Sequence, residues 1–140
     1  LLDALHRHCT DRDRPVRVVE DDPAARDMLR RTMERAGWTV LEAENGRVAL
    51  ERLADAQPQL LLLDLMMPEM DGFELAARLR TLPEWRQLPI IVVTARDLSP
   101  DDRARLNGSV VAVLQKGAYG AQELLAEVRH AIAGSDNGRS

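Results

Sequence analysis

The stretch Leu60-Leu-Leu-Leu-Asp64-Leu-Met-Met-Pro68-Glu-Met-Asp71-Gly72 carries the strongest structural signal in the chain. Four consecutive leucines are too short to span a membrane, but they suit a strand buried on both faces of a parallel sheet. The run stops at Asp64, and Pro68 and the pair Asp71-Gly72 are turn signals before a new helical pattern. We therefore expect Asp64 at the carboxyl end of a central strand, where ligands of open α/β sheets bind. A cap of the next helix is the simpler alternative for such an aspartate.

Length and composition limit the class of protein. The 140 residues suit one domain with one core. The formal net charge of −4 gives no reason to expect direct contact with nucleic acid or an anionic membrane. The single cysteine, Cys9, cannot form an internal disulfide, which fits a cytoplasmic location. Because residue 1 is Leu rather than Met, we expect a piece of a longer protein.

Short apolar runs alternate with amphipathic helical patterns along the chain. Strands are expected at 16–19, 38–43, 60–63, 89–93 and 110–114. This alternation predicts a doubly wound, five-stranded parallel sheet in the order 2-1-3-4-5 with five helices. Three segments are expected: 1–14 as a linker or the tail of an upstream helix, 15–133 as the folded domain, and 134–140 as a disordered tail.

Five polar side chains fall at the carboxyl ends of four of these strands. They are Glu20, Asp21, Asp64, Thr94 and Lys116. Taken singly, each has an ordinary explanation as a solvated loop residue, a helix cap or a surface lysine. Because the carboxyl ends of parallel strands meet at one edge of the sheet, we expect all five to converge there.

The residue types indicate phosphoryl chemistry. Three neighbouring carboxylates repel one another unless a cation lies among them, and Mg²⁺ takes carboxylate oxygens and bridges to phosphate. A carboxylate such as Asp64 can attack phosphorus, while Mg²⁺, Lys116 and the Thr94 hydroxyl could neutralise the phosphoryl oxygens. The sequence contains no GxxxxGK[ST], GxGxxG or GxSxG motif, so nucleotide-binding and acyl-transfer chemistry lack their usual parts.

These motifs resemble the receiver domain of two-component response regulators, a flavodoxin-like, CheY-like family, over roughly residues 16–132. Val-Val-Glu20-Asp21-Asp22-Pro is similar to the acidic pair of the family. Leu-Leu-Asp64-Leu-Met-Met-Pro68-Glu-Met-Asp71-Gly72 is similar to its phosphoacceptor loop, and Ile-Val-Val-Thr94-Ala95 and Leu-Gln-Lys116 resemble the remaining two signatures.

The resemblance implies a role for each site residue. Asp64 would accept a phosphoryl group from the phosphohistidine of a histidine kinase or a histidine phosphotransfer protein. Asp21, Asp64 and the backbone carbonyl of Met66 would ligand Mg²⁺, and Glu20 would act through a metal-bound water. Thr94 and Lys116 would complete the catalytic set. A homodimer is a further possibility.

Two positions depart from the family pattern. Gly117 follows Lys116 where the family usually has proline, and Val113 stands where it usually has an aromatic switch residue. The rotation of an aromatic ring coupled to Thr94 is therefore not expected here. Lys-Gly in place of Lys-Pro resembles receivers attached to hybrid sensor kinases, so we expect that origin, with a tether to a membrane-bound or soluble kinase. A standalone response regulator is the main alternative.

Two other classes of function are alternatives. One is a pseudo-receiver that binds partners without phosphorylation, which would have no need for Asp64 and Lys116. The other is a Mg²⁺-dependent phosphatase, which needs an acid two residues after its nucleophile; Met66 cannot transfer a proton. Met66 and Arg96 are also expected to hinder the water that hydrolyses the aspartyl phosphate, so dephosphorylation should be slow.

Overall fold

A computed structural model describes residues 15–53, 58–65, 70–95, 98–106, 110–115, 117 and 120–139. Within residues 134–139 it describes the backbone alone. The expected linker at 1–14 lies outside the described residues. Among the residues that are described, no helix is both long enough and apolar enough to cross a bilayer.

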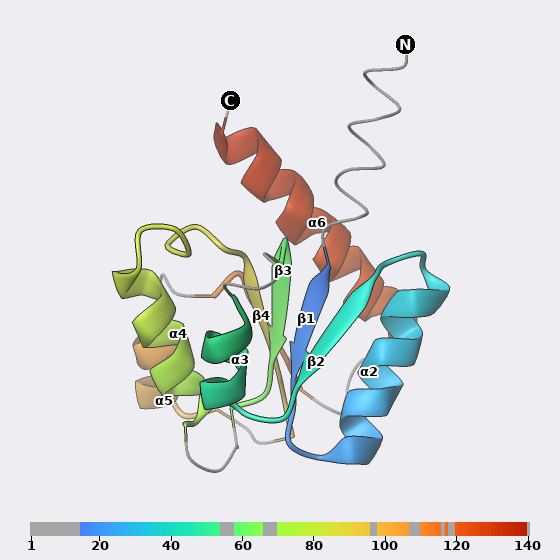
Figure 1. Cartoon of the computed structure of the whole chain (residues 1–140), viewed down its shortest axis with the longest axis horizontal. Helices are drawn as coiled ribbons and strands as arrows, with labels where there is room; N and C mark the ends of the chain where they lie inside the picture. Colours follow the sequence, from blue (N-terminus) through green and yellow to red (C-terminus); the bar gives the residue numbers. More distant parts are fainter. Residues whose placement is uncertain are drawn as a thin grey trace.

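Five parallel strands form a single sheet (Figure 1). They are β1 (Val16–Val19), β2 (Val40–Ala43), β3 (Leu60–Leu63), β4 (Ile90–Thr94) and β5 (Ala112–Gln115). Their order is β2-β1-β3-β4-β5, and every neighbouring pair is parallel. The predicted doubly wound sheet and its strand order are confirmed.

The strands are connected by helices whose ends follow local sequence signals. The described helices are α2 (Pro23–Arg35), α3 (Gly46–Leu53), α4 (Gly72–Thr81), α5 (Pro100–Leu106) and α6 (Ala121–Arg139). The Asp22 carboxylate caps α2 by accepting from Ala25 N at 3.2 Å. Beyond the other end, Gly37 takes a φ of 95°, which lets the chain leave the helix.

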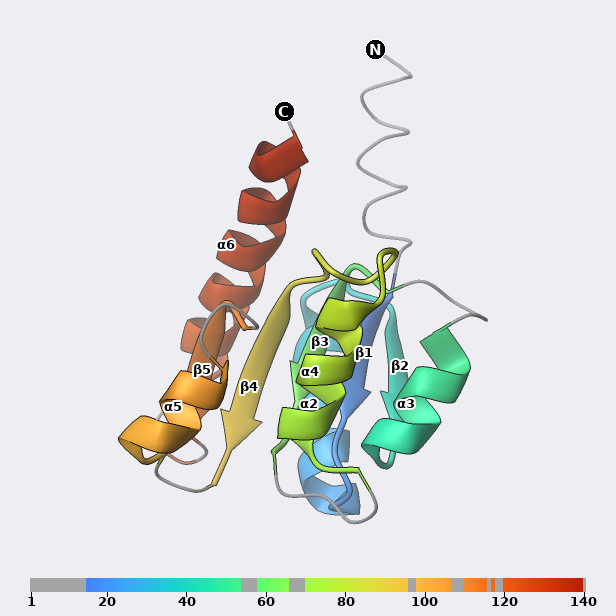
Figure 2. The same cartoon turned by 90° about the vertical axis from the view of Figure 1, so that its left-hand side faces the viewer.

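The sheet is covered on both faces, as the unbroken apolar run of β3 requires. Side chains of β1 and β3 alternate between the two faces: Val18 and Leu62 pack with α2 and α6, whereas Val19 and Leu63 pack with α3 and α4. Figure 2 shows α4 crossing one face of the sheet. All eight side chains of β1 and β3 are at most 3% exposed. These two strands therefore form a rigid base for Glu20 and Asp64, the residues that follow them.

Several element boundaries differ from the predictions. The pair Asn45-Gly46 is a turn signal in the sequence. In the structure it begins α3, because the Asn45 side chain accepts a hydrogen bond from Val48 N at 2.9 Å and caps the helix. The second and fifth strands are shorter at their starts than predicted. The backbone of α6 continues to Arg139 and so enters the segment expected to be a tail.

One buried arginine and one partly buried arginine were not anticipated from the sequence. Arg17 lies in β1 at 3% exposure and donates to the backbone oxygens of Glu42 and Arg52. Arg80, at the end of α4, donates to the backbone oxygens of Trp85 and Leu88. Burial lowers the pKa of Arg80. Arg17 thus links β1 to β2 and α3, and Arg80 links α4 to the loop that follows it. Both side chains satisfy carbonyl acceptors that would otherwise be costly to bury.

Candidate functional site

The two central strands end level with each other. Val19 and Leu63 are register partners, so the next residues, Glu20 and Asp64, leave the sheet side by side. Asp64 N donates to Val19 O at 3.0 Å, and Glu20 N donates to Ala43 O at 3.1 Å. The backbone of both acidic residues is therefore still held by strand-type hydrogen bonds.

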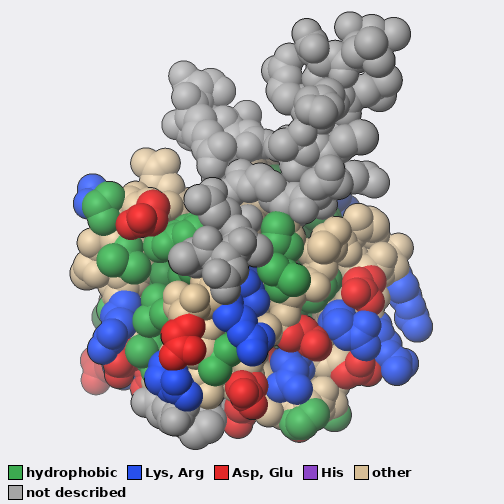
Figure 3. All heavy atoms as spheres, in the orientation of Figure 1, with side chains coloured by type: hydrophobic (Ala, Val, Ile, Leu, Met, Phe, Trp, Pro, Cys, Tyr) green, Lys and Arg blue, Asp and Glu red, His purple; other side chains and the backbone are tan. Residues whose placement is uncertain are grey.

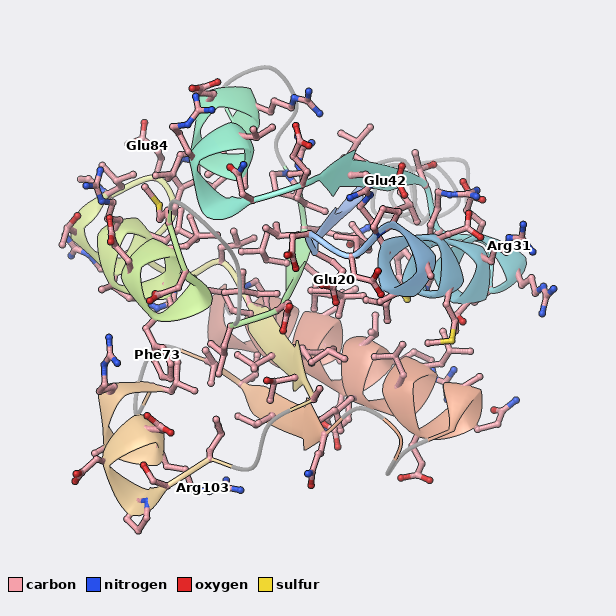
Figure 4. All side chains as sticks on the ribbon, turned by 90° about the horizontal axis from the view of Figure 1, so that it is seen from below. Glu20, Arg31, Glu42, Phe73, Glu84 and Arg103 are labelled. Atoms are coloured by element: carbon pink, nitrogen blue, oxygen red, sulfur yellow. The ribbon has the colours of Figure 1, made fainter. Side chains whose placement is uncertain are left out.

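Three carboxylates meet at this edge of the sheet. One carboxylate oxygen from each of Glu20, Asp21 and Asp64 lies within 4.8 Å of the others. Glu20 is 1% exposed and Asp64 is 5% exposed, whereas Asp21 is exposed. Figure 4 looks onto this edge and places Glu20 near the centre, where β1 leads into α2. The predicted convergence of these three residues is confirmed.

The donor set fits a hard divalent cation. Three negative groups this close repel one another, and partial burial strengthens that repulsion. Every donor in the set is a carboxylate oxygen, which is the ligand type of Mg²⁺ rather than of softer metals. Because Asp21 is exposed, the carboxylate set is open toward solvent. A Mg²⁺ ion, which keeps several of its waters, needs such an opening.

A buried hydroxyl lies at the end of the neighbouring strand. Thr94 is 0% exposed and is the last residue of β4, which pairs with β3. It is the register partner of Gln115, the last residue of β5. Lys116 would follow directly, but Lys116 and Met66 both lie outside the described residues, so their predicted roles stay predictions.

A close approach fixes the helix that follows Asp64. Gly72 N donates to Leu65 O at 3.1 Å, and the Asp71 carboxylate caps α4 by accepting from Glu74 N at 2.9 Å. A Cβ on Gly72 would lie 2.6 Å from Asp64 O, closer than real Cβ atoms come. The family-like pair Asp71-Gly72 therefore has a physical reason: one residue caps the helix and the other lets it touch the strand end.

The region between the site and α5 is built from aliphatic side chains and one aromatic ring. Leu65, Phe73, Val92 and Leu106 form a buried cluster, and Val113 packs against it. The Arg105 guanidinium carbon lies 4.0 Å from the centre of the Phe73 ring. Val113 stands where the family usually has an aromatic switch residue, and it adds a small side chain to this cluster.

The backbone at Gly117 differs from what a proline would allow. Gly117 has a φ of 85°, in the left-handed region, whereas the proline ring fixes φ near −65°. The departure from Lys-Pro is therefore a change of backbone conformation as well as of residue type.

Arg26 was not among the predicted site residues. Its Nη1 donates to Glu20 O at 3.0 Å, so a cation from the first part of α2 contacts the acidic turn. One signal was available: a basic residue close to the start of a helix is disfavoured by the helix dipole and calls for a specific partner.

Comparison with known proteins agrees with this geometry. The family model described as "Response regulator receiver domain" matches residues 16–129. The chain belongs to the response regulator receiver domain family.

Relatives are found among regulators and kinases. The response regulator MprA of Mycolicibacterium vanbaalenii is 41% identical over 117 residues, which are 82% of this chain and 49% of the relative. The chain thus spans about half the length of the MprA relatives it matches. A receiver domain of a signal transduction histidine kinase from Syntrophus aciditrophicus aligns with a TM-score of 0.78 at 30% identity, covering 86% of this chain and 90% of that one.

A second solved structure shares the fold alone. It is the receiver domain of a sensor histidine kinase from Pseudomonas aeruginosa, with a TM-score of 0.78 at 23% identity over 86% of this chain and 98% of that one. That protein has a magnesium ion coordinated in its active site cleft.

Proposed function

We propose that this receiver domain accepts a phosphoryl group on Asp64 in a Mg²⁺-dependent reaction and either signals through it or passes it on. The observation that carries the proposal is the carboxylate cluster: Glu20, Asp21 and Asp64 place oxygens within 4.8 Å of one another at the end of the central strands. A partner-binding module without phosphorylation has no need for three repelling carboxylates on a rigid base.

Transfer of the phosphoryl group to Asp64 would be a single displacement at phosphorus. An Asp64 carboxylate oxygen forms the new O–P bond, and the P–N bond to the histidine of a kinase or phosphotransfer protein breaks. The imidazole nitrogen keeps the electron pair of that bond. Mg²⁺, when bound, would neutralise phosphoryl oxygens. It would be held by Asp21, Asp64 and the Met66 carbonyl, with Glu20 acting through a water.

The chain's own residues supply positioning. Asp64 follows β3 with its N–H bonded to Val19 O, so the nucleophile starts from a fixed direction. The Thr94 hydroxyl would donate to one phosphoryl oxygen, and the Lys116 ammonium would neutralise another. Phosphorylation adds about −1.5 to −2 charge, and this charge would bias the loops around the site.

The test is intact-protein mass after incubation with Mg²⁺ and acetyl phosphate, in which the P–O bond breaks and acetate leaves. One added phosphoryl group is expected on the wild-type protein and on an Asp101→Asn control, which lacks an exposed carboxylate outside the cluster. No adduct is expected on Asp64→Ala or in EDTA. An adduct that persists on Asp64→Ala, or none on the wild type, would overturn the proposal.

We further propose that the domain is a cytoplasmic part of a hybrid sensor kinase. The support is Gly117 in place of proline and the likeness, at 30% identity, to a histidine kinase receiver. A standalone regulator is the rival. A histidine kinase core in the full-length protein is the expected finding, and a DNA-binding output domain in its place would contradict it. This receiver itself would then contact protein partners, with no direct contact to nucleic acid or membrane.

A further inference from the structure

Arg26 links the acidic turn to the edge strand of the sheet. Its Nη1 donates to Glu20 O at 3.0 Å, and its Nε lies 3.7 Å from Glu42 Oε1. The side chain is 23% exposed and that of Glu42 is 38% exposed, so this pair is partly shielded from solvent. Figure 4 labels Glu20 where β1 leads into α2 and Glu42 on the neighbouring strand β2.

The Glu20 backbone is consequently held at both of its polar groups. Its N–H donates to Ala43 O at 3.1 Å, and its carbonyl oxygen accepts from Arg26. The Glu20 side chain also accepts from Asp22 N at 3.3 Å. Since the Glu20 carbonyl belongs to the peptide that leads into Asp21, fixing that carbonyl fixes the direction in which both carboxylates leave the backbone.

Anchoring α2 to β2 does not by itself require Arg26. Arg30 makes the same kind of bridge, with Nε 3.6 Å from Glu42 Oε1. Arg30 is held further by Asp27 and Glu34, and its hydrogen bond to Asp27 raises its pKa. Acidic and basic side chains are interspersed over this helix, on the right of Figure 3.

The location of Arg26 also carries a local cost. It is the fourth residue of α2, and the first turn of that helix contains no acidic residue to offset the dipole. A cation near a helix N-terminus is disfavoured. Glu42 offsets this charge from the neighbouring strand. What separates Arg26 from Arg30 is therefore the bond to the Glu20 carbonyl.

From these contacts we propose that Arg26 is a positioning residue for the Mg²⁺ site, acting through the Glu20 carbonyl. The inference rests on the proposed function. Two effects of Arg26 on Mg²⁺ affinity have opposite signs. Its positive charge repels the ion, so charge alone would make an Arg26→Gln protein bind Mg²⁺ more tightly. Loss of the fixed turn would make the same protein bind more weakly. The second effect is expected to be the larger one, because Glu42 Oε1, 3.7 Å from Arg26 Nε, offsets part of the Arg26 charge.

The experiment is titration calorimetry of Mg²⁺ binding at fixed ionic strength, with thermal melting of each protein in EDTA. Arg26→Gln is expected to weaken binding by about tenfold, as loss of outer partners of metal ligands commonly does. Arg26→Lys keeps the charge, but a single ammonium cannot replace the guanidinium fork that reaches Glu20 O and Glu42 together, so a smaller loss in the same direction is expected. Arg30→Gln is the matched control and should bind Mg²⁺ as the wild type does.

The outcomes separate the inference from the proposed function. Wild-type affinity in Arg26→Lys together with unchanged or tighter binding in Arg26→Gln would overturn the positioning role while leaving the metal site intact. Failure of the wild-type protein to bind Mg²⁺ would overturn the site and the inference together. Equal loss of affinity in Arg30→Gln would assign the effect to the bridge between α2 and β2 and so also contradict it. The melts in EDTA identify any variant whose weaker binding reflects unfolding.

Discussion

Gly72 lies so close to Asp64 that the two residues leave no room for a side chain between them. The nearest heavy atom to a Cβ built on Gly72 would be Asp64 O at 2.6 Å, and the next would be Leu65 Cα at 2.8 Å. Both neighbours are backbone atoms that cannot rotate away. The start of α4 and the end of β3 are therefore one rigid unit that contains the proposed phosphoacceptor.

This contact predicts that Gly72→Ala is destabilising. Forcing a methyl group against buried backbone costs about 1–3 kcal/mol of unfolding free energy, and relief of the clash would shift Asp64. Urea denaturation measures the first effect and Mg²⁺ titration the second. Gly120→Ala is the control, because a Cβ there meets nothing within 4 Å. Equal stability losses in the two variants would contradict the steric argument.

Removing one carboxylate from the cluster should stabilise the metal-free protein. Asp64→Asn relieves repulsion among groups within 4.8 Å of one another, and a gain of about 1 kcal/mol is expected in EDTA. Added Mg²⁺ should raise the melting temperature of the wild type but not of Asp64→Asn, because a ligand stabilises only the state that binds it. Asp101→Asn should behave as the wild type in both conditions. A less stable Asp64→Asn protein would count against mutual repulsion.

The contact between Arg105 and Phe73 should hold α5 against α4. Arg105→Gln removes a cation 4.0 Å from the ring centre, which stabilises such contacts by about 0.5–1 kcal/mol. Faster amide hydrogen exchange in α5 is the expected result. Arg103→Gln changes an exposed arginine of the same helix and should leave the exchange unchanged. Equal acceleration in both variants would assign the effect to net charge.

The left-handed backbone at Gly117 predicts a ranked series of substitutions. Asn tolerates positive φ, Ala tolerates it less, and Pro cannot adopt it. The free energy of unfolding should therefore fall in the order Gly, Asn, Ala, Pro, with Gly117→Ala costing about 1–2 kcal/mol. No atom lies within 4 Å of a Cβ at this position, so the series reports the backbone alone. A proline variant as stable as the wild type would show that the loop can change its backbone conformation.

The residue two positions after Asp64 should set the lifetime of the phosphoryl group. Met66 is apolar, so it cannot orient the hydrolytic water, and Met66→Asn should shorten the lifetime of the adduct severalfold. The decay of the phosphorylated mass species after removal of acetyl phosphate measures it. Loss of the phosphoryl group from the wild type within seconds would refute the expected slow dephosphorylation.

The interior of the fold was predictable because its signals are unambiguous. Leu60–Leu63 is apolar throughout, and Val16–Val19 is apolar except for Arg17; both strands have the bounds that were predicted. The acidic cluster followed from them, since residues after level strand ends must meet. Thr94 was likewise placed correctly at the end of β4.

The start of α3 depended on a side-chain contact that local patterns do not encode. Asn45 can either form a turn or cap a helix. Here its side-chain oxygen accepts a hydrogen bond from Val48 N, so it caps α3. Arg17 and Arg26 act on backbone carbonyl groups supplied by other elements, and no spacing in the sequence reports such acceptors. Hydrophobic periodicity finds the layers of this domain, whereas the partners of its long polar side chains need the folded coordinates.

The level register of β1 and β3 limits how this protein can evolve. Val19 pairs with Leu63, so adding or deleting one residue in either strand would turn its side chains to the opposite face and carry Glu20 or Asp64 out of the cluster. Length changes are therefore tolerable only in the outer loops and helices. Lineages that descend from such a domain can diversify their partners there while the chemistry at the sheet edge is inherited unaltered.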